Sequence, residues 1–350
     1  MLKTLFKILT TAFVVIITIA VFLGIFIYLN GSSLYRQFFT KGYENIQNSD
    51  VRLVAVVNGQ TKTNGGANLS DKFRIGSITK VFTATILLQL IQTGKLNLDS
   101  HASDFVTSVA LPSDITVKEL LQQTSGIKDG SDEKAFYPAI ASPSATMKRS
   151  DFIKFASFKN KKDWVYSNTN YLLIGEIIEK VTGKSIAQNL HERIIDPLRL
   201  SNTCVPLADK NCSAEIGYTD VKANFNIDQG VIKMSDMTAF YGIADSAGYL
   251  ISNVADLQTF FRALITGKII DFNQMKNAVN AGTNGYFYQM KYGLGTMSFN
   301  DGSYGHAGQS FDTNTLVKFY PDRNSADIVL IGHSNISADK VMWQLRSAKK

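Results

Sequence analysis

A serine and a lysine, Ser77 and Lys80, stand three residues apart in the run Ser-Ile-Thr-Lys. On a helix, residues with this spacing lie on one face and can reach each other. A neutral lysine amine can take the proton of a serine hydroxyl when burial and nearby groups lower the pKa of the lysine. The backbone N–H of Ser77, near a helix N-terminus, could also face a developing oxyanion. The pair therefore predicts a nucleophilic serine with a lysine as its base.

The spacing alone is not specific, because the S-x-x-K pattern occurs five times, starting at Ser77, Ser125, Ser131, Ser337 and Ser347. The last four lie in glycine-rich, charged or terminal contexts. Only Ser77 opens a long apolar run, VFTATILLQLIQT, which ends at Gly94. That run predicts a buried central helix, and its burial would supply the desolvation that Lys80 needs.

A phenol and an amide stand two residues apart at Tyr166 and Asn168. A phenol beside a lysine ammonium can be stabilised as a phenolate and can then carry a proton to a leaving group or from a water. The alternative is structural, because an aromatic residue before a polar turn at a helix start is usually a packing and capping feature. The same Y-x-N spacing also occurs at Tyr28 and Tyr43, so spacing does not decide between the two interpretations.

A histidine flanked by glycines occurs in the run Gly305-His306-Ala307-Gly308, between two predicted strands. Such glycines allow a ligand to approach a strand backbone closely, and the next N–H, on Gln309, could serve as a second oxyanion donor. A hairpin turn with an exposed histidine is the alternative.

Two cysteines, Cys204 and Cys212, enclose a seven-residue loop. An extracellular location would permit a disulfide across it, and two free thiols are the alternative. Neither cysteine has a histidine close in sequence that would suggest a catalytic pair.

The elements around these residues alternate in type along the chain. The segment 51–57 (VRLVAVV) predicts a strand that turns at Asn58-Gly59, and Gly65-Gly66 marks a further loop. Helices are predicted at Tyr171–Val181, Ala255–Leu264 and Val341–Ser347, and strands at Tyr292–Phe299, Thr315–Tyr320 and Ala326–Ile331. Strands at both ends with helices between them indicate an α+β fold in one body from about residue 51 to 350.

The N-terminal residues have a different character. Residues 8–29 form an uncharged apolar run of 22 residues, which as a helix would span about 33 Å against a hydrocarbon core of about 30 Å. A buried soluble helix and a cleaved signal peptide are the alternatives, but no polar face interrupts the run and no clear cleavage site follows it. With Lys3 and Lys7 before it, the run predicts a single-pass anchor with a cytoplasmic stub (1–7), a stem (30–50) and an extracellular domain (51–350).

Composition excludes several classes of protein. Hydrophobic residues make up 45% and charged residues 19% of the 350 residues, which argues against a disordered chain. Four scattered histidines and two cysteines predict no metal site. The net charge of +7 comes without a long basic block or a nucleic-acid motif, so no nucleic-acid partner is expected.

Taken together and in this order, the three motifs resemble those of the serine β-lactamase and penicillin-binding-protein superfamily, and most closely its class C-like branch of β-lactamases, D-alanyl-D-alanine carboxypeptidases and esterases. The resemblance extends to longer stretches and covers residues 51 to about 335. They are FRIGSITKVFTATILLQLIQTGKLNLD, ITVKELLQQTSGIKD, WVYSNTNYLLIGEIIEKVTGKSIAQNLHERIIDPLRLSNT, SAGYLISNVADLQTFFRALITGKII, YGLGTMSF and GHAGQS. It implies a mainly antiparallel sheet flanked by helices, a helical lobe beside it, and a site between the two.

The resemblance also implies a role for each motif residue. Ser77 would be acylated, Lys80 would be its base, and Tyr166 would carry protons for the leaving group and the deacylating water. Asn168 would hold the substrate amide, and the N–H groups of Ser77 and Gln309 would form the oxyanion hole. His306 and Gly308 would line the third wall of the site. No metal or organic cofactor is implied.

Two departures from the family pattern affect the expected substrate. Many relatives have Lys-Thr-Gly where this chain has His306-Ala307-Gly308, and a histidine, mostly neutral at pH 7, would attract a substrate carboxylate less than a lysine would. The stretch after Gly308, QSFDTNT, lacks a further glycine that is usual there, which leaves the shape of the acyl pocket open.

The expected function is that of a membrane-anchored extracellular serine hydrolase acting through an acyl-enzyme. Its expected substrates carry D-alanine, either in a peptidoglycan stem peptide or as an ester on teichoic acid, and β-lactams are expected as acylating ligands. A β-lactamase is the alternative with the same chemistry. A non-catalytic envelope-binding protein with the same fold is the alternative of another class.

Overall fold

The computed structural model describes residues 42–130, 148–154, 157, 164–215, 217–220, 231–233, 238–276, 279–280 and 290–348. The predicted anchor at 8–29 and the predicted stem up to residue 41 lie outside these residues. Within the described part of the chain, none of the helices is both long and apolar enough to cross a membrane.

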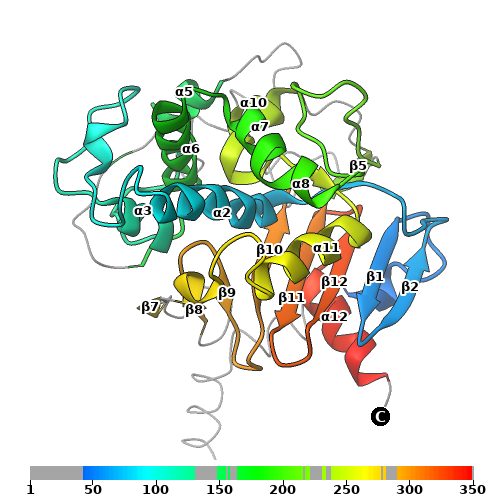
Figure 1. Ribbon diagram of the computed structural model, residues 1–350. Coiled ribbons are helices and arrows are strands. Elements are labelled where there is room, and N and C mark those ends of the chain that lie inside the picture. Colours follow the sequence, from blue (N-terminus) through cyan, green and yellow to red (C-terminus); the bar gives the residue numbers. More distant parts are fainter. Residues whose placement is uncertain are drawn as a thin grey trace, which may run out of the picture.

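An antiparallel sheet of eight strands forms the centre of the body, in the order β2-β1-β12-β11-β10-β9-β8-β7 (Figure 1). Its strands are β1 (Leu53–Val57), β2 (Gln60–Asn64), β7 (Val279–Asn280), β8 (Lys291–Tyr292), β9 (Met297–Ser298), β10 (Tyr304–Gln309), β11 (Asn314–Tyr320) and β12 (Ser325–Ile331). Strands from the two ends of the body therefore pair side by side. Two small sheets join β3 (Phe73–Arg74) to β6 (Ile251–Ser252) and β4 (Tyr218–Asp220) to β5 (Val231–Lys233).

Helices cover both faces of this sheet, which explains why every residue of β1 is buried. Side chains alternate between the faces of a strand. Leu53 and its alternate neighbours pack with α12 (Ala338–Ser347), whereas Val54 and Val56 belong to the larger core that includes α11 (Val254–Ile265). Figure 1 shows α11 and α12 on opposite sides of the strands. The hairpin predicted at Asn58-Gly59 joins β1 to β2, and both turn residues have positive φ, as a type I′ turn requires.

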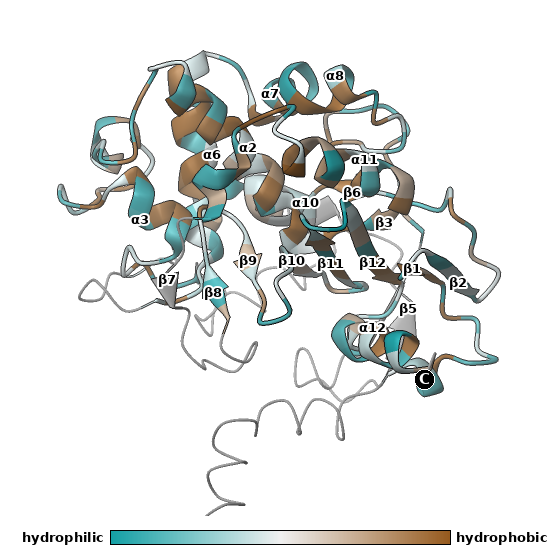
Figure 2. Ribbon diagram, turned by 60° about the horizontal axis from the view of Figure 1, so that its bottom comes forward, coloured by the Kyte–Doolittle hydropathy of each residue, from teal (hydrophilic) through white to brown (hydrophobic). Residues whose placement is uncertain are grey.

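A helical lobe lies beside the sheet and is built around α2 (Thr79–Gln92), which is buried on nearly all sides. Helices α6 (Asn168–Thr182) and α10 (Thr238–Gly248) pack directly on α2, and Figure 2 shows α2 and α6 next to each other with many hydrophobic residues along both ribbons. The remaining helical segments are α3 (Val117–Gln122), α5 (Arg149–Ile153), α7 (Ile186–Leu190), α8 (Asp196–Leu198), the π-helical turn η5 (His191–Ile195) and the 3₁₀ turns η1 (Tyr43–Asn45), η2 (Gly76–Ile78), η3 (Ala102–Asp104) and η6 (Phe272–Lys276). The sheet and this lobe confirm the predicted α+β fold.

Residues 42–50, the end of the predicted stem, lie against α12. The N–H of Tyr43 donates to Gln344 Oε1 at 2.7 Å, and Glu44 forms an ion pair with Lys340 at 2.9 Å. Ile46 is completely buried in the core under α12. This packing ties these residues to the folded body.

The strand predicted at Tyr292–Phe299 is wrong as a single element. The structure has two short strands there, β8 and β9, joined by a tight turn in which the N–H of Gly293 donates to the carbonyl of Thr296 at 2.7 Å. Gly295 has φ +92°, a conformation that glycine adopts without strain. Gly293 and Gly295 therefore allow the chain to reverse its direction between β8 and β9.

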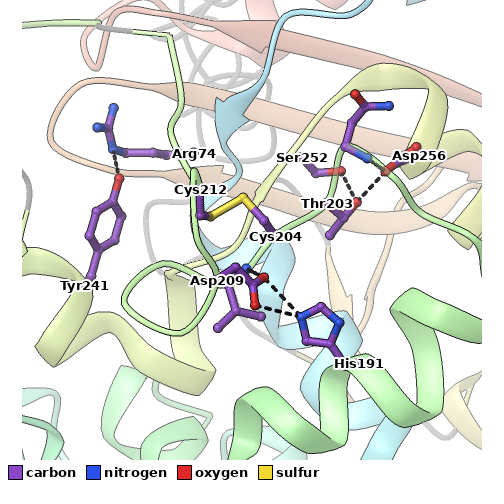
Figure 3. Close-up of a disulfide and its surroundings, with 11 residues drawn as sticks. Arg74, His191, Thr203, Cys204, Asp209, Cys212, Tyr241, Ser252 and Asp256 are labelled. Carbon is purple, nitrogen blue, oxygen red and sulfur yellow. Dashed lines mark hydrogen bonds and ion pairs between the residues drawn. A yellow bond between two sulfur atoms is a disulfide. The ribbon is translucent and has the colours of Figure 1, made fainter.

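Cys204 and Cys212 form a disulfide, with their Cα atoms 5.6 Å apart (Figure 3). This settles the question that the sequence left open. Inside the closed loop, Asp209 accepts from the N–H of Val205 at 2.7 Å and contacts the imidazole of His191 at 3.0 Å. The loop is thereby attached to the turn after α7.

Candidate active site

Ser77 lies at the entrance to α2, in the 3₁₀ turn η2 rather than in the α-helix itself, which begins at Thr79. Gly76, with φ +51°, allows the chain to turn sharply before the helix. Ser77 is partly exposed, whereas Lys80, one turn further on, is completely buried. The predicted apolar helix thus presents the serine at its end and buries the lysine.

The side chain of Lys80 has three hydrogen-bond partners. Its Nζ lies 3.0 Å from Ser77 Oγ, 2.7 Å from Asn168 Oδ1 and 2.7 Å from the carbonyl oxygen of Ala247. The last two are carbonyl-type oxygens that can only accept. When Lys80 is neutral, its two N–H groups are therefore held by Asn168 and Ala247, and its lone pair points at the hydroxyl of Ser77.

Burial lowers the pKa of Lys80 to about 7, and the negative charge of Asp129 acts in the opposite direction. A lysine with this pKa is about half neutral at pH 7, compared with far less than one per cent for an ordinary lysine. Position and protonation state together equip Lys80 to take a proton from Ser77.

Asp129 is a buried carboxylate that the sequence analysis did not single out. It accepts a hydrogen bond from the N–H of Asn168, the first residue of α6, and it is close enough to Lys80 to affect its pKa. Its only sequence signal is its place after Gly126 in the stretch TSGIKD. Asp129 fixes the end of α6 from which Asn168 reaches Lys80.

The ring of Tyr166 also lies beside the lysine, with its centre 5.0 Å from Lys80 Nζ. Trp164 and Tyr292 flank this ring, each at 6.3 Å between ring centres. Asn168 uses its Oδ1 for Lys80, so its Nδ2 is the group that can donate to a substrate carbonyl. The structure thus gathers the serine, lysine, tyrosine and asparagine motifs around one amine.

His306 lies within strand β10 and is completely buried, so the alternative of a hairpin turn with an exposed histidine is wrong. Its Nδ1 is 2.5 Å from the carbonyl oxygen of Ala307 and must therefore carry the proton. Its Nε2 then accepts from the hydroxyl of Tyr292 at 3.0 Å. Burial and the charge of Lys80 lower the pKa of His306 to about 3. The histidine is neutral at pH 7, and both of its ring nitrogens are occupied within the protein.

Gly308 and Gln309 bring the end of β10 against the turn that carries Ser77. A Cβ on Gly308 would lie 2.0 Å from the carbonyl oxygen of Ile75, and one on Gly76 would lie 2.6 Å from the backbone nitrogen of Gln309. Only glycine fits at these two contacts. The N–H of Ser310 donates to the carbonyl of Thr313, and hydrogen-bonded and non-hydrogen-bonded pairs alternate along antiparallel strands. The next pair, Gln309 and Asn314, is therefore not hydrogen-bonded, and the N–H of Gln309 points away from β11, toward the edge of β10 that has no partner there among the described strands. The N–H groups of Ser77 and Gln309 therefore lie on neighbouring segments.

No group of three or more His, Cys, Asp and Glu side chains is placed to hold a metal ion among the residues that the structure describes. The chemistry that the arrangement offers is that of its serine, amine and phenol. Tyr292 and Trp164, like Asp129, were missed in the sequence, although Tyr292 begins the YGLG stretch and Trp164 precedes the tyrosine motif by two residues.

A sequence model of the family described as Beta-lactamase matches residues 34–346. The chain belongs to the beta-lactamase family. It is a serine hydrolase of this family, and its relatives include hydrolases and amidohydrolases.

Three relatives show how this beta-lactamase-family chain compares with known proteins. The teichoic acid D-alanine hydrolase of Staphylococcus aureus is 32% identical over 131 residues, which are 37% of this chain and 32% of that protein. The match thus spans about a third of the length of that relative. PbpX of Bacillus subtilis (strain 168), named as a penicillin-binding protein, is 25% identical over 308 residues, or 83% of this chain and 72% of PbpX. The solved structure of a D-stereospecific amidohydrolase from Streptomyces sp. has a TM-score of 0.70 and 29% identity, and the match covers 83% of this chain and 92% of that one.

Proposed function

We propose that this beta-lactamase-family hydrolase removes D-alanyl groups from esters whose leaving group carries no carboxylate, such as the D-alanyl esters of teichoic acid. The observation that carries the proposal is the state of His306. Recognition of a free carboxylate beside the scissile bond needs a cation or open N–H donors at this position. His306 is neutral, buried and bonded to Tyr292 and Ala307, so it supplies neither.

The charge of the acyl group supports the same substrate class. A D-alanyl ester carries a free ammonium group next to its carbonyl, whereas β-lactams and D-Ala-D-Ala peptides carry a carboxylate on the leaving side. A lysine at position 306 would repel that ammonium in a site of low dielectric constant. A neutral histidine does not. Two relatives point to D-configured acyl groups, since one is named as a teichoic acid D-alanine hydrolase and the other as D-stereospecific.

The proposed reaction is two acyl transfers. In the first, Ser77 Oγ attacks the ester carbonyl while the neutral amine of Lys80 takes its proton, and the N–H groups of Ser77 and Gln309 stabilise the oxyanion. Tyr166 passes a proton to the departing alkoxide, and Asn168 Nδ2 holds the acyl portion. In the second, the Tyr166 phenolate takes a proton from a water that attacks the acyl-enzyme carbonyl. Lys80 then returns its proton to Ser77 Oγ as the acyl bond breaks, which releases D-alanine and restores Ser77.

We also propose that residues 8–29 anchor the protein, with residues 1–7 in the cytoplasm and the catalytic body outside the cell. Their length and lack of charge support this. Such a tether would keep the body close to polymers of the inner envelope.

Four small substrates test the effect of the leaving-group carboxylate separately for an ester bond and for an amide bond. They are D-alanine methyl ester, D-alanyl-D-lactate, D-alanyl-D-alaninamide and D-alanyl-D-alanine, assayed with the full-length protein in detergent, with the Ser77→Ala variant and L-alanine methyl ester as controls. We expect kcat/KM to be at least about tenfold higher for each substrate without a carboxylate than for its carboxylate partner, because a carboxylate that enters the site without a cation or N–H donor loses its hydration without compensation.

Equal or higher kcat/KM for the carboxylate partners would refute the ester assignment and favour a carboxypeptidase. Rapid multiple-turnover hydrolysis of nitrocefin would favour a β-lactamase. Hydrolysis that is unchanged in Ser77→Ala would remove Ser77 from the mechanism. Release of D-alanine from purified lipoteichoic acid, measured by mass spectrometry, then tests the polymer itself.

A further inference from the structure

Asp312, in the turn between β10 and β11, forms a buried ion pair with Arg74 of β3, and the proposed reaction does not use this pair. Arg74 Nη1 lies 2.5 Å from Asp312 Oδ2, and the side chains are 7% and 0% exposed. Asp312 belongs to the stretch QSFDTNT, where a glycine usual in the family is missing. A buried carboxylate with its own counter-ion thus lies within the part of the chain that departs from the family pattern.

Each member of the pair lies three residues from one of the proposed oxyanion donors. Arg74 precedes Ser77 by three residues, and Asp312 follows Gln309 by three. A second contact joins the same two segments, because Thr313 Oγ1 donates to the carbonyl oxygen of Arg74 at 2.8 Å. The strand β3, which precedes Ser77, and the turn that follows β10 are therefore held together by these contacts.

Other contacts hold both charged groups in place. Asp312 also accepts from the N–H of Gly217 at 3.2 Å and from Ser310 Oγ at 2.7 Å. Arg74 Nε donates to the hydroxyl of Tyr241 at 2.7 Å, and Figure 3 shows this contact close to the disulfide. Tyr241 belongs to α10, the helix whose Ala247 carbonyl accepts from Lys80. The ion pair consequently connects three segments that contribute to the site.

Breaking such a buried ion pair destabilises the structure around it. Removing one partner leaves the other as an uncompensated buried charge, and the surrounding backbone must move to hydrate it. The two oxyanion donors lie three residues along the chain from the pair, and Gly76 packs closely against the backbone nitrogen of Gln309, so a shift of either segment moves one donor relative to the other.

We propose that Arg74 and Asp312 are positioning residues that fix the spacing between the N–H groups of Ser77 and Gln309. The inference rests on the proposed function, because it assigns those two groups to the oxyanion. Oxyanion contacts form only in the transition state, so a disturbed spacing lowers kcat and leaves KM nearly unchanged.

The test compares Asp312→Asn with Asp327→Asn. Asp327, which is also buried, forms an ion pair at 2.6 Å with Arg346, whose side chain is 24% exposed, but this pair lies toward the other end of the β11–β12 pair. We expect Asp312→Asn to lower kcat for D-alanine methyl ester about 10- to 100-fold with KM within about threefold, as a displacement of up to about 1 Å implies. Both substitutions are expected to lower the melting temperature by a similar amount. Asp327→Asn, however, is expected to change kcat less than about twofold.

Two further measurements separate positioning from general stability. The affinity for 1-aminoethylboronic acid, which forms a tetrahedral adduct with the serine, is expected to fall with kcat in Asp312→Asn, whereas the affinity for the product D-alanine stays the same. The double variant Arg74→Met/Asp312→Asn removes the buried charge, so its melting temperature is expected to recover while kcat stays low.

The inference is overturned if Asp312→Asn keeps kcat within about twofold of the wild type, or if the double variant regains kcat together with stability. Failure of the proposed function has a different outcome, because the wild-type protein would then hydrolyse the carboxylate-bearing substrates at least as well as their partners, or hydrolysis would survive Ser77→Ala.

Discussion

The pKa of Lys80 makes the proposed acylation step dependent on pH in a way that a single substitution can test. Burial lowers this pKa from 10.5 to about 7. At pH 7 the neutral fraction is then about one half, compared with about one in 3,000 for a lysine at 10.5. Acylation by a neutral Lys80 therefore rises with pH and reaches half of its maximum near pH 7.

The decisive perturbation is Asp129→Asn, which removes a negative charge and keeps the shape and the acceptor for the N–H of Asn168. Asp129 raises the pKa of Lys80, so its loss lowers that pKa further. Asp129 reaches Lys80 through Asn168, which suggests a separation of roughly 8 Å between the charges. At an effective dielectric constant of about 20, such a pair interacts by about 2 kcal/mol, which moves the midpoint of the rate profile down by about one to two pH units.

The assay is the second-order rate of labelling of Ser77 by an uncharged fluorophosphonate between pH 5 and 9. The probe does not titrate in this range, whereas the ammonium of a D-alanyl substrate would. His306 does not interfere, because its pKa of about 3 lies below the range. His191 requires a control, since its hydrogen bonds to Asp196 and Asp209 outweigh its partial burial and raise its pKa. His191→Gln and Asp327→Asn are both expected to keep the wild-type midpoint.

A wild-type rate that is constant from pH 5 to 9 would show that Lys80 is not the base. A midpoint that stays in place or moves upward in Asp129→Asn would refute the electrostatic reasoning. Loss of labelling at all pH values with a folded protein would mean that Asp129 acts mainly by holding Asn168.

Three further predictions concern single features of the structure. His306→Lys is expected to raise kcat/KM for D-alanyl-D-lactate relative to D-alanine methyl ester by about tenfold, as a new charge-assisted contact implies, and an unchanged ratio would contradict the role given to the neutral histidine. Gly308→Ala places a Cβ 2.0 Å from the carbonyl oxygen of Ile75, so kcat is expected to fall at least about 100-fold in a protein that circular dichroism shows to be folded, and wild-type kcat would argue against this close contact. Replacing Cys204 and Cys212 by serine opens a loop with a sequence separation of 8, so urea unfolding is expected to show a loss of about 2–3 kcal/mol without a change in kcat, whereas a loss below about 0.5 kcal/mol would show that the loop is held by other contacts.

The long elements of the fold were predictable because local patterns determine them. The apolar run from Val81 to Thr93 becomes a helix that ends before Gly94, and the strand before Asn58-Gly59 turns where that dipeptide predicts. The predicted helix at Tyr171–Val181 is also present, although the observed α6 already starts at Asn168. Periodicity and turn chemistry act over a few residues, so a single sequence contains them.

The features on which the proposed substrate depends were not predictable in the same way. His306 stands between glycines, a context that also suits an exposed turn, and only its partner Tyr292, 14 residues earlier, and the strands on either side bury it. Asp129 reaches Asn168 across 39 residues of chain, and Arg74 reaches Asp312 across 238. Such contacts depend on how distant segments pack, and no local pattern encodes them.

The charges of Lys80 and His306 are linked, and this linkage bears on why a histidine suits the site. The positive charge of Lys80 contributes to the lowered pKa of His306, so the two groups oppose each other's protonation. A lysine at position 306 would add a second ammonium and depress the pKa of Lys80 still further, which weakens it as a base at neutral pH. With histidine, the site keeps one titrating amine that is poised near pH 7. Under the proposed function, this suits a substrate that brings its own ammonium group, and the neutral histidine that offers no cation to a carboxylate also preserves the base.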